Sequence, residues 1–256
     1  MSMLRLDSIT RRFGGLVALE NVSLEIQTSG ITAIIGPNGA GKTTLFNIIS
    51  GFNTPSAGRV LFGDDDITGI APELIARRGL IRTFQLVQLF DELSVLENVK
   101  VGRHLHTRGG LLMAFLPRLA ARREAEVEAA AQALLRQTGL ADRACVPASA
   151  LPYGQKRLLE IARALAAEPK LLLLDEPAAG LNREETLRLA ELLRAVAAAG
   201  TAVLLIEHDM TLVMNVAAQI AVLDFGRLIA NGTPAEVRQN PDVIAAYLGQ
   251  AEAALA

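Results

Sequence analysis

The sequence predicts an α/β fold with a parallel sheet, an antiparallel β-subdomain at the N-terminus and a helical insertion. Three observations carry this prediction. The short β-branched segment at residues 31–35 and the continuous apolar segments at residues 171–174 and 202–206 are typical of parallel strands that are covered on both faces. The first residues of the chain instead alternate between apolar and polar types, and residues 72–139 have a helical texture rich in Ala, Glu and Arg.

The N-terminal part predicts a strand pair followed by a buried strand and a helix. Residues 4–13 and 15–26 read as strands joined by a turn at Gly14 and Gly15. The β-branched segment 31–35 is then followed by a glycine-rich loop and by a helix that Gly51 closes. Residues 59–69 read as a further strand and turn.

The rest of the chain predicts helices and then a return of strands. The helical periodicity is clearest at residues 73–79, 95–102 and 122–139. The amphipathic segment 183–200 lies between two apolar strands and completes a βαβ unit. Residues 220–237 predict a hairpin around Gly226 and then a helix that opens at Thr233 and Pro234.

Composition supports a globular protein with a core and gives no support to several other classes of protein. The chain has 256 residues, of which 51% are hydrophobic, so it can bury a sizeable core. A net charge of -2 and an aromatic content of 4% give no support to binding of nucleic acid or an anionic membrane. The single cysteine, Cys145, excludes an intrachain disulfide, and a reducing, cytosolic location is the default.

The N-terminus lacks an apolar segment like that of a signal peptide. The longest apolar runs, such as residues 111–116, are far below the roughly 18 residues that suggest a membrane span. We therefore expect that a partner would hold this chain at a membrane, if it works there.

The segment GPNGAGKT, residues 36–43, matches G-x-x-x-x-G-K-[ST] at every fixed position. A buried strand precedes it and a helix follows, which makes a chance glycine-rich turn improbable. Its backbone N–H groups and the helix N-terminus would bind phosphates. Lys42 would reach the β- and γ-phosphates, and the Thr43 hydroxyl would bind Mg²⁺.

Two carboxylates follow the apolar strand in LLLLDEP, residues 171–177. Asp175 could hold the hydration shell of Mg²⁺, and Glu176 could polarise an attacking water. The alternative is an acid that caps the next helix. A phosphate loop upstream favours the catalytic interpretation.

His208 and Gln85 are weaker candidates when each is considered by itself. His208 stands at the tip of the next apolar strand and could hydrogen-bond a γ-phosphate, but a surface histidine beside the capping Asp209 is the better-supported alternative. A single glutamine such as Gln85 indicates nothing on its own.

The order of these elements resembles the ATPases of ABC transporters over nearly the whole chain. The phosphate loop, Gln85, LPYGQ, LLLLDEP and His208 follow one another as in that family. The resemblance implies a P-loop NTPase with an ABC-ATPase core, and one ABC ATPase domain over residues 1–256. Its core would be 1–84 and 157–256, and its helical and signature subdomain about 85–156.

The resemblance also implies roles for individual residues. ATP and Mg²⁺ would be the cofactors, and two such subunits would close face to face with each ATP between one phosphate loop and the other subunit's signature. Glu176, His208 and Gln85 would be catalytic, and Thr43, Gln85 and Asp175 would bind Mg²⁺, partly through water. The residues implied for ATP binding are Phe13, Gly36, Pro37, Asn38, Gly39, Ala40, Gly41, Lys42, Thr43 and Thr44. Those implied for the signature are Leu151, Pro152, Tyr153, Gly154 and Gln155.

Finer features resemble one branch, the G-type ATP-binding subunits of branched-chain amino acid importers. These are L-x-Y-G in the signature, DEPAAGLN, LLIEHDM, RTFQLVQLF, the insertion at residues 110–131 and the C-terminal NGTPAEVRQNPDVIAAYLG. The branch implies a second ATPase subunit, identical or different, two permease subunits and a solute-binding protein outside the membrane. The chain would then lie on the cytoplasmic face of the membrane.

Several alternatives stay open. Residues 90–99 and the insertion would form the docking surface, although their apolar residues could equally belong to the core. The cargo could be urea or another amide, or lipopolysaccharide in an exporter. The chain could also be an ATP-gated regulatory module without a solute, although such relatives usually carry two cassettes and a charged linker.

The sequence departs from the family pattern at the signature. Pro152 stands where most members have serine, so one hydroxyl and one backbone N–H are lost, and Tyr153 replaces a glycine. A neutral hydrogen bond contributes about 0.5–1.5 kcal/mol. We therefore predict an active ATPase with a weakened signature contact, although Tyr153 could simply pack against the insertion.

Two further positions depart from the pattern. Phe13 stands where the family often stacks tyrosine on adenine, and it could also be a small hydrophobic plug. Asn182 replaces an aspartate that many members carry, so a charge-dependent contact across the dimer is in doubt there.

Overall fold

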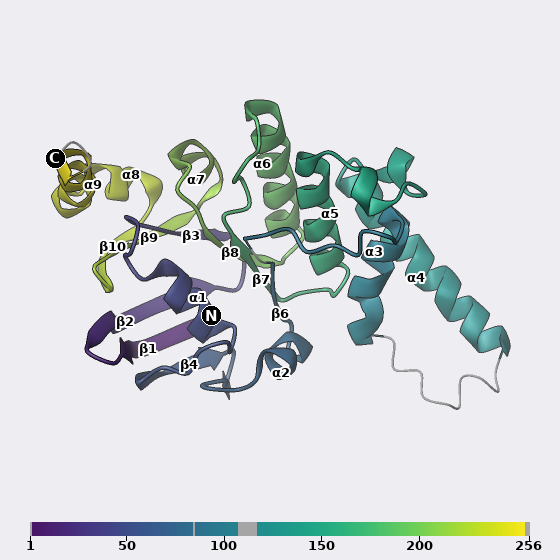
Figure 1. The fold of residues 1–256 in the computed structure, drawn as a ribbon. Coiled ribbons are helices and arrows are strands. Elements are labelled where there is room, and N and C mark those ends of the chain that lie inside the picture. The colour runs from purple at the N-terminus through teal and green to yellow at the C-terminus, as the bar shows by residue number, and fades with distance from the viewer. Residues whose placement is uncertain (1, 84, 107–116, 254–256) are drawn as a thin grey trace. The chain divides into compact units, whose positions relative to one another are not determined.

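The computed structural model describes residues 2–83, 85–106 and 117–253. It divides into two compact units (Figure 1). The first comprises Met1–Arg82, Lys170–Ala178 and Leu193–Ala256, and the second comprises Thr83–Pro169 and Ala179–Leu192. The apolar run at residues 111–116, noted in the sequence, lies outside the described residues.

A six-stranded sheet forms the centre of the first unit. Its strand order is β10-β9-β3-β8-β7-β6. Every residue of the three central apolar strands is buried, which explains why these segments show no polar alternation. The strands are β3 (Ile31–Ile35), β6 (Leu80–Arg82), β7 (Leu171–Asp175), β8 (Ala202–Ile206), β9 (Gln219–Asp224) and β10 (Arg227–Gly232). All neighbours pair in parallel except β9 and β10, which form the predicted hairpin.

The predicted antiparallel N-terminal subdomain is confirmed as a second sheet of the same unit. Its four strands are ordered β2-β1-β4-β5 and pair in antiparallel fashion. They are β1 (Ser2–Phe13), β2 (Leu16–Gln27), β4 (Ala57–Phe62) and β5 (Asp65–Asp66). Alternate side chains of β1 and β2 point into a core that they share with α1 (Lys42–Ile49). This core anchors the helix that follows the phosphate loop.

Four further helices belong to the first unit. They are α2 (Pro72–Arg77), α7 (Met210–Val216), α8 (Pro234–Gln239) and α9 (Pro241–Ala253). The predicted opening of α8 at Thr233 is confirmed, because the Thr233 hydroxyl and the Glu236 carboxylate form a reciprocal capping box.

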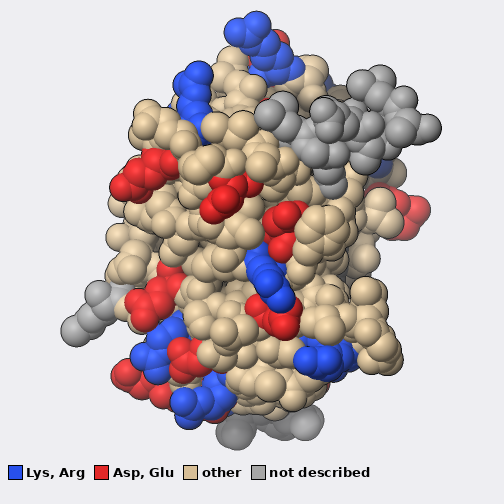
Figure 2. Space-filling model, turned by 90° about the vertical axis from the view of Figure 1, so that its left-hand side faces the viewer, with Lys and Arg blue, Asp and Glu red and all other residues tan. Residues whose placement is uncertain are grey.

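On the face in Figure 2, basic and acidic side chains are interspersed, as expected for a chain with a net charge near zero.

The second unit is helical. It contains α3 (Val95–Gly102), α4 (Pro117–Gln137) and α5 (Tyr153–Leu165), together with the first half of α6 (Arg183–Ala198). Among the described residues, short 3-10 helices lie between them at Arg103–His106, Ala141–Arg143 and Ala148–Ala150. Ser94 and Glu97 form a capping box that starts α3, and Val95 and Val99 on its inner face are fully buried.

One strand was missed by the sequence analysis. Residues 72–139 were expected to be helical, but β6 interrupts them and pairs in parallel with β7, with Leu80 opposite Leu171. Three residues are too few to show a strand periodicity, and the pairing depends on a partner about ninety residues away.

Among the described residues, no helix is both long and apolar enough to cross a membrane.

Candidate nucleotide-binding and catalytic site

Three glycines of the phosphate loop adopt left-handed backbone conformations. Gly36, Gly39 and Gly41 have φ values of 148°, 81° and 98°. A Cβ atom at Gly36 would lie 2.0 Å from the Leu223 carbonyl oxygen, and one at Gly41 would lie 2.6 Å from that of Ala18. Only glycine fits these positions, so the sequence motif has a direct steric basis.

The loop leads into the N-terminus of α1. Gly41 is the N-cap residue, and no side chain caps the helix there. The first backbone N–H groups of a helix have no intrahelical acceptor and favour bound phosphate. Within the motif, Asn38 and Thr43 are exposed, whereas Pro37 and Ala40 are buried.

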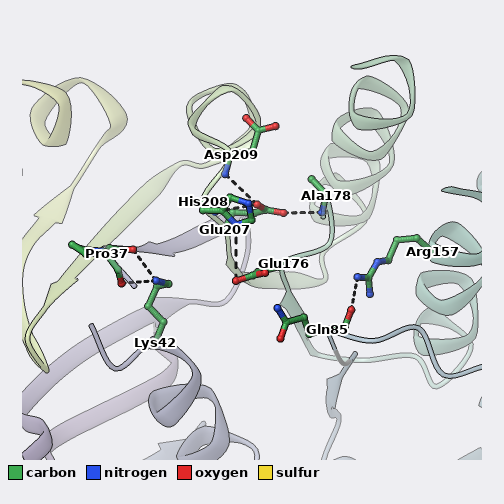
Figure 3. A network of polar contacts seen from close by, with 10 residues as sticks. Pro37, Lys42, Gln85, Arg157, Glu176, Ala178, Glu207, His208 and Asp209 are labelled. Atoms are coloured by element: carbon green, nitrogen blue, oxygen red, sulfur yellow. Dashed lines mark hydrogen bonds and ion pairs between the residues drawn. The ribbon is translucent and has the colours of Figure 1, made fainter. Parts of the chain in front are cut away.

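The Lys42 ammonium is held against the loop that precedes it. Its Nζ donates hydrogen bonds to the carbonyl oxygens of Gly36 (2.7 Å) and Pro37 (2.9 Å) (Figure 3). Burial lowers the pKa of Lys42, while the carboxylates of Glu176 and Asp175 act in the opposite direction. Lys42 of the phosphate loop therefore lies close enough to both predicted acids, Asp175 and Glu176, to interact with them electrostatically.

The carboxyl ends of β7 and β8 bring the predicted catalytic groups together. Glu176 follows β7 directly, with a left-handed φ of 47°, and its N–H donates to the Ile206 carbonyl at the end of β8. The nearest Glu176 carboxylate oxygen lies 3.9 Å from His208 Nδ1 (Figure 3). Glu176 is partly buried, and the His208 side chain is 65% exposed. His208 can therefore still reach a ligand.

Glu207 is a buried carboxylate that the sequence analysis did not single out. Its side chain accepts hydrogen bonds from the backbone N–H groups of Ala178 (2.7 Å), His208 (3.0 Å) and Asp209 (3.3 Å) (Figure 3). Burial raises its pKa, against the effect of these donors. Glu207 thus ties together the loops that follow β7 and β8. Its signal was a carboxylate at the end of an apolar strand, beside His208.

Asp175 is paired with an arginine that was also missed. Its Oδ2 atom lies 2.8 Å from a guanidinium nitrogen of Arg82, and each side chain is only 7% exposed.

Phe13 is half-exposed, and the Arg11 guanidinium lies 4.5 Å from the centre of its ring. An aromatic ring with one covered face fits a base-stacking role as well as a structural one.

The second unit contains Gln85 and the signature segment. The Gln85 carbonyl oxygen accepts a 2.7 Å hydrogen bond from Arg157, a fully buried residue of α5 (Figure 3). Arg157 also pairs with Glu160 at 2.8 Å. The sequence analysis singled out neither Arg157 nor Glu160. The segments that Arg157 joins, α5 and the segment that carries Gln85, are far apart in the sequence.

Pro152 is the N-cap residue of α5 and makes no side-chain capping bond. Leu151 before it is buried, and the helix starts with Tyr153, Gly154 and Gln155, whose N–H groups lie in its first turn. A Cβ atom on Gly154 would lie 2.1 Å from a carboxylate oxygen of Glu185, so this glycine packs closely against the start of α6.

The neighbour of Tyr153 differs from the alternative considered in the sequence analysis. Its ring lies 3.0 Å from the position that a Cβ atom on Gly180 would take. Gly180 belongs to the AAGLN segment before α6, whereas the alternative considered from the sequence was packing against the insertion. Tyr153 is still 46% exposed.

The predicted site residues thus fall into two groups. The first unit brings together the phosphate loop, Asp175, Glu176 and His208, with Phe13 on its β-subdomain, and the second unit holds Gln85 and the signature. The described residues contain no cluster of three or more His, Cys, Asp or Glu that could hold a metal. A hydroxyl and one carboxylate, Thr43 and Asp175, nevertheless suit Mg²⁺, which keeps waters and phosphate oxygens as ligands.

This fold and this phosphate-binding site define a nucleotide-binding ATPase. The family model of ABC transporters matches residues 19–179, and the chain belongs to the ATP-binding proteins of that family. A second family model, of branched-chain amino acid ATP-binding cassette transporters, matches residues 227–253. The predictions of an ABC ATPase fold and of ATPase activity are thereby confirmed.

Individual relatives are similar over nearly the full length. The chain is 46% identical over 251 residues to the high-affinity branched-chain amino acid transport ATP-binding protein LivG of Escherichia coli, covering 97% of this chain and 98% of that protein. An ATP-binding cassette of an ABC transporter, solved in its ADP conformation, is 34% identical with a TM-score of 0.84, covering 97% and 99% of the two chains. A bacterial ABC transporter cassette solved as a dimer is 26% identical with a TM-score of 0.77, covering 91% and 99%.

Proposed function

We propose that this chain is the ATP-hydrolysing subunit of an importer of branched-chain amino acids. The observation that carries the cargo assignment is the 46% identity to LivG over 97% of the chain, together with the C-terminal match at residues 227–253. No feature of the described residues favours urea, lipopolysaccharide or a regulatory module.

ATP would bind through the phosphate loop. Gly36, Pro37, Asn38, Gly39, Ala40, Gly41, Lys42, Thr43 and Thr44 would surround its phosphates, and Phe13 would stack on the adenine. Lys42 would exchange its two carbonyl acceptors for phosphate oxygens, which are stronger partners for an ammonium. Its burial keeps this charge close to the phosphates rather than in bulk water.

The residues present fit a bound Mg²⁺ that would neutralise charge on the phosphates. Thr43 would offer its exposed hydroxyl, and Asp175 would act through water. Gln85 would contribute its side-chain oxygen. Asp175 is anchored at one carboxylate oxygen by Arg82, so its orientation is fixed before any ligand arrives.

Glu176 would orient and polarise the water that attacks the γ-phosphate. Its backbone N–H is bonded to the Ile206 carbonyl at the end of β8, which fixes the point of the chain from which the side chain extends. His208, 3.9 Å away, would hydrogen-bond the γ-phosphate. Glu207 holds both loops in place, and Gln85 would sense the γ-phosphate.

The signature residues Leu151, Pro152, Tyr153, Gly154 and Gln155 would contact the ATP of a second ATPase subunit. The N–H groups in the first turn of α5 remain free for this task although Pro152 supplies no donor. A dimeric structure of a related cassette is consistent with such pairing. One lost neutral hydrogen bond, about 0.5–1.5 kcal/mol, weakens this contact without abolishing it.

Two permease subunits and a solute-binding protein outside the membrane would complete the importer, with this chain at the cytoplasmic face of the membrane. Within residues 90–99, Val95 and Val99 are buried and belong to the core, whereas Phe90 is 50% exposed. Phe90 is therefore the better candidate for a contact with a permease.

Uptake of labelled leucine tests this proposal. Cells that lack the protein would be complemented with the wild type or with Glu176→Gln, and expression of both would be checked. Restoration by the wild type alone is expected. Leucine uptake that neither copy changes would overturn the cargo, and the same cells would then be tested with urea and for envelope integrity. Equal restoration by both copies would overturn the role of Glu176.

A further inference from the structure

Arg82 and Asp175 form a buried ion pair at the carboxyl edge of the parallel sheet. Arg82 ends β6 and Asp175 ends the neighbouring strand β7. The distance from the guanidinium to the carboxylate Oδ2 is 2.8 Å, and each side chain is 7% exposed. The pair therefore lies in a low-dielectric setting, where its geometry is strongly constrained.

The other side of the Arg82 guanidinium contacts α1 and the residues that follow it. Its second terminal nitrogen donates to the Asn47 side-chain oxygen (2.8 Å) and to the Ser50 hydroxyl (2.8 Å). The rings of Phe46 and Phe52 lie 5.6 and 5.7 Å from the guanidinium carbon. Since α1 begins at Lys42, Arg82 connects the phosphate-loop helix to Asp175.

The two oxygens of Asp175 are in different situations. Oδ2 accepts a hydrogen bond from Arg82, whereas no hydrogen bond to Oδ1 is found among the residues that the structure describes. Asp175 also lies within electrostatic reach of Lys42. Oδ2 is therefore anchored, whereas Oδ1 has no hydrogen bond from the described residues, and the carboxylate as a whole interacts with Lys42 of the phosphate loop.

We propose that Arg82 is a positioning residue for Asp175, which anchors Oδ2 and thereby presents Oδ1 to the hydration shell of the Mg²⁺ that accompanies ATP. This inference rests on the proposed nucleotide function. Arg82 is suited to the role because its planar fork can hold a carboxylate on one side and two neutral acceptors on the other. A lysine keeps the charge but cannot make this set of bonds.

The inference separates metal binding from nucleotide binding. Without the guanidinium, the Asp175 carboxylate is free to rotate and loses its fixed alignment with the phosphate loop. The loop itself, with Lys42 and the glycines, would be intact. Partners that orient a metal-binding group change metal affinity by about 10- to 100-fold when they are removed.

The experiment compares purified full-length wild type, Arg82→Met and Arg82→Lys. ATP binding is measured by calorimetry in EDTA and at increasing Mg²⁺, and Mn²⁺ binding in the presence of ATP is measured by electron paramagnetic resonance. We expect metal-free ATP binding to stay within about two-fold of the wild type. The metal concentration at half-saturation should rise about 10-fold or more in Arg82→Met, and less in Arg82→Lys.

Two controls make the result specific. Arg78→Met removes a partly exposed arginine, 3.8 Å from Asp65, and should leave metal dependence unchanged. Asp175→Asn should weaken metal binding, and adding Arg82→Met to it should cause no further loss, because Arg82 acts through Asp175. This double variant carries no uncompensated charge, so it decides the question even if Arg82→Met does not fold.

Three results would overturn the inference. They are unchanged metal dependence in Arg82→Met, an equal loss of metal-free and metal-dependent ATP binding, or additive effects in the double variant. A wild type whose ATP binding does not respond to Mg²⁺ would overturn the proposed function itself, and the inference with it.

Discussion

The Arg157 guanidinium donates one hydrogen bond to the Gln85 carbonyl oxygen, at 2.7 Å, and another to the Glu160 carboxylate, at 2.8 Å. Arg157 is fully buried, and Glu160 also accepts a hydrogen bond from the backbone of Gln88. Arg163 donates to the Gln88 carbonyl from the next turn of α5. The signature helix is thus joined at two points to the segment that carries Gln85.

Arg157→Met should strongly destabilise the protein. It leaves Glu160 buried without its cation, and breaking such a pair typically costs about 3–5 kcal/mol. Replacing both residues, as in Arg157→Met with Glu160→Met, should cost less, because no charge is left behind. Urea unfolding measures both. Arg188→Ala, which breaks an exposed pair with Glu184, should have no measurable effect, and a similar loss there would refute the account.

Glu207→Gln should change how stability depends on pH. Because burial raises the pKa of Glu207 above its ordinary value of 4.5, the folded state holds this proton to higher pH than the unfolded state does. The contribution of Glu207 to stability is therefore full below pH 4.5 and is lost as pH rises through the raised pKa. The unfolding free energy of the wild type minus that of Glu207→Gln should therefore fall as pH rises from 4.5 through the raised pKa of Glu207.

Glu236→Gln is the matched control for Glu207, with the opposite sign. Hydrogen bonds from Thr233 lower the pKa of the Glu236 carboxyl. Its stabilising contribution is therefore present above pH 4.5 and lost as pH falls through the lowered pKa. Urea titrations of both variants across the acidic and neutral range would show opposite slopes, and slopes of the same sign would contradict the assignment.

Lys42→Ala should weaken ATP binding by about 10- to 100-fold, because a charge-assisted hydrogen bond contributes about 1.5–3 kcal/mol. The unfolding free energy should change much less, since within the described part of the chain the ammonium donates hydrogen bonds to the loop carbonyls of Gly36 and Pro37 alone. Calorimetry with ATP provides the measurement. Lys170→Ala, at an exposed position outside the loop, should bind ATP as the wild type does.

Pro152→Ser should restore a helix cap at small net cost or gain. The backbone at Pro152 (φ −56°, ψ 155°) matches that at Ser94 and Thr233, whose side chains do cap their helices. A serine cap contributes about 0.5–2 kcal/mol, and the loss of proline's rigidity in the unfolded chain offsets about 0.4–1 kcal/mol of it.

We therefore expect Pro152→Ser to be slightly more stable than the wild type and Pro152→Ala to be less stable. ATP turnover in Pro152→Ser should rise by no more than about 10-fold, the equivalent of one hydrogen bond. A much larger rise, or turnover that appears only in the serine variant, would show that the natural signature is defective.

The site was predictable where its chemistry is local in the sequence. The phosphate loop has glycines with left-handed backbone conformations, and the two acids stand at the end of β7 and directly after it. Each of these features carries its signal within a few residues. The strands β3, β7 and β8 were predictable because burial on both faces leaves continuous apolar segments. The assignments of catalytic and binding roles to these residues stay predictions.

What the sequence did not reveal depends on contacts between distant segments. Strand β6 is defined by its pairing with β7 rather than by its own three residues. Arg82 and Arg157 look like ordinary charged residues until folding buries them beside Asp175 and Glu160. Such partners carry no local pattern, since either residue could equally be exposed.

The most direct test of the central claim is ATP turnover by the purified full-length wild type and Glu176→Gln, with ATP binding measured in parallel. The account predicts Mg²⁺-dependent turnover by the wild type that rises per chain with protein concentration, because two subunits must pair. Turnover by Glu176→Gln should be at least about 100-fold lower, with ATP binding nearly unchanged. A wild type that binds ATP but does not hydrolyse it, either alone or with its partner ATPase subunit added, or a variant that hydrolyses it at the wild-type rate, would contradict the account.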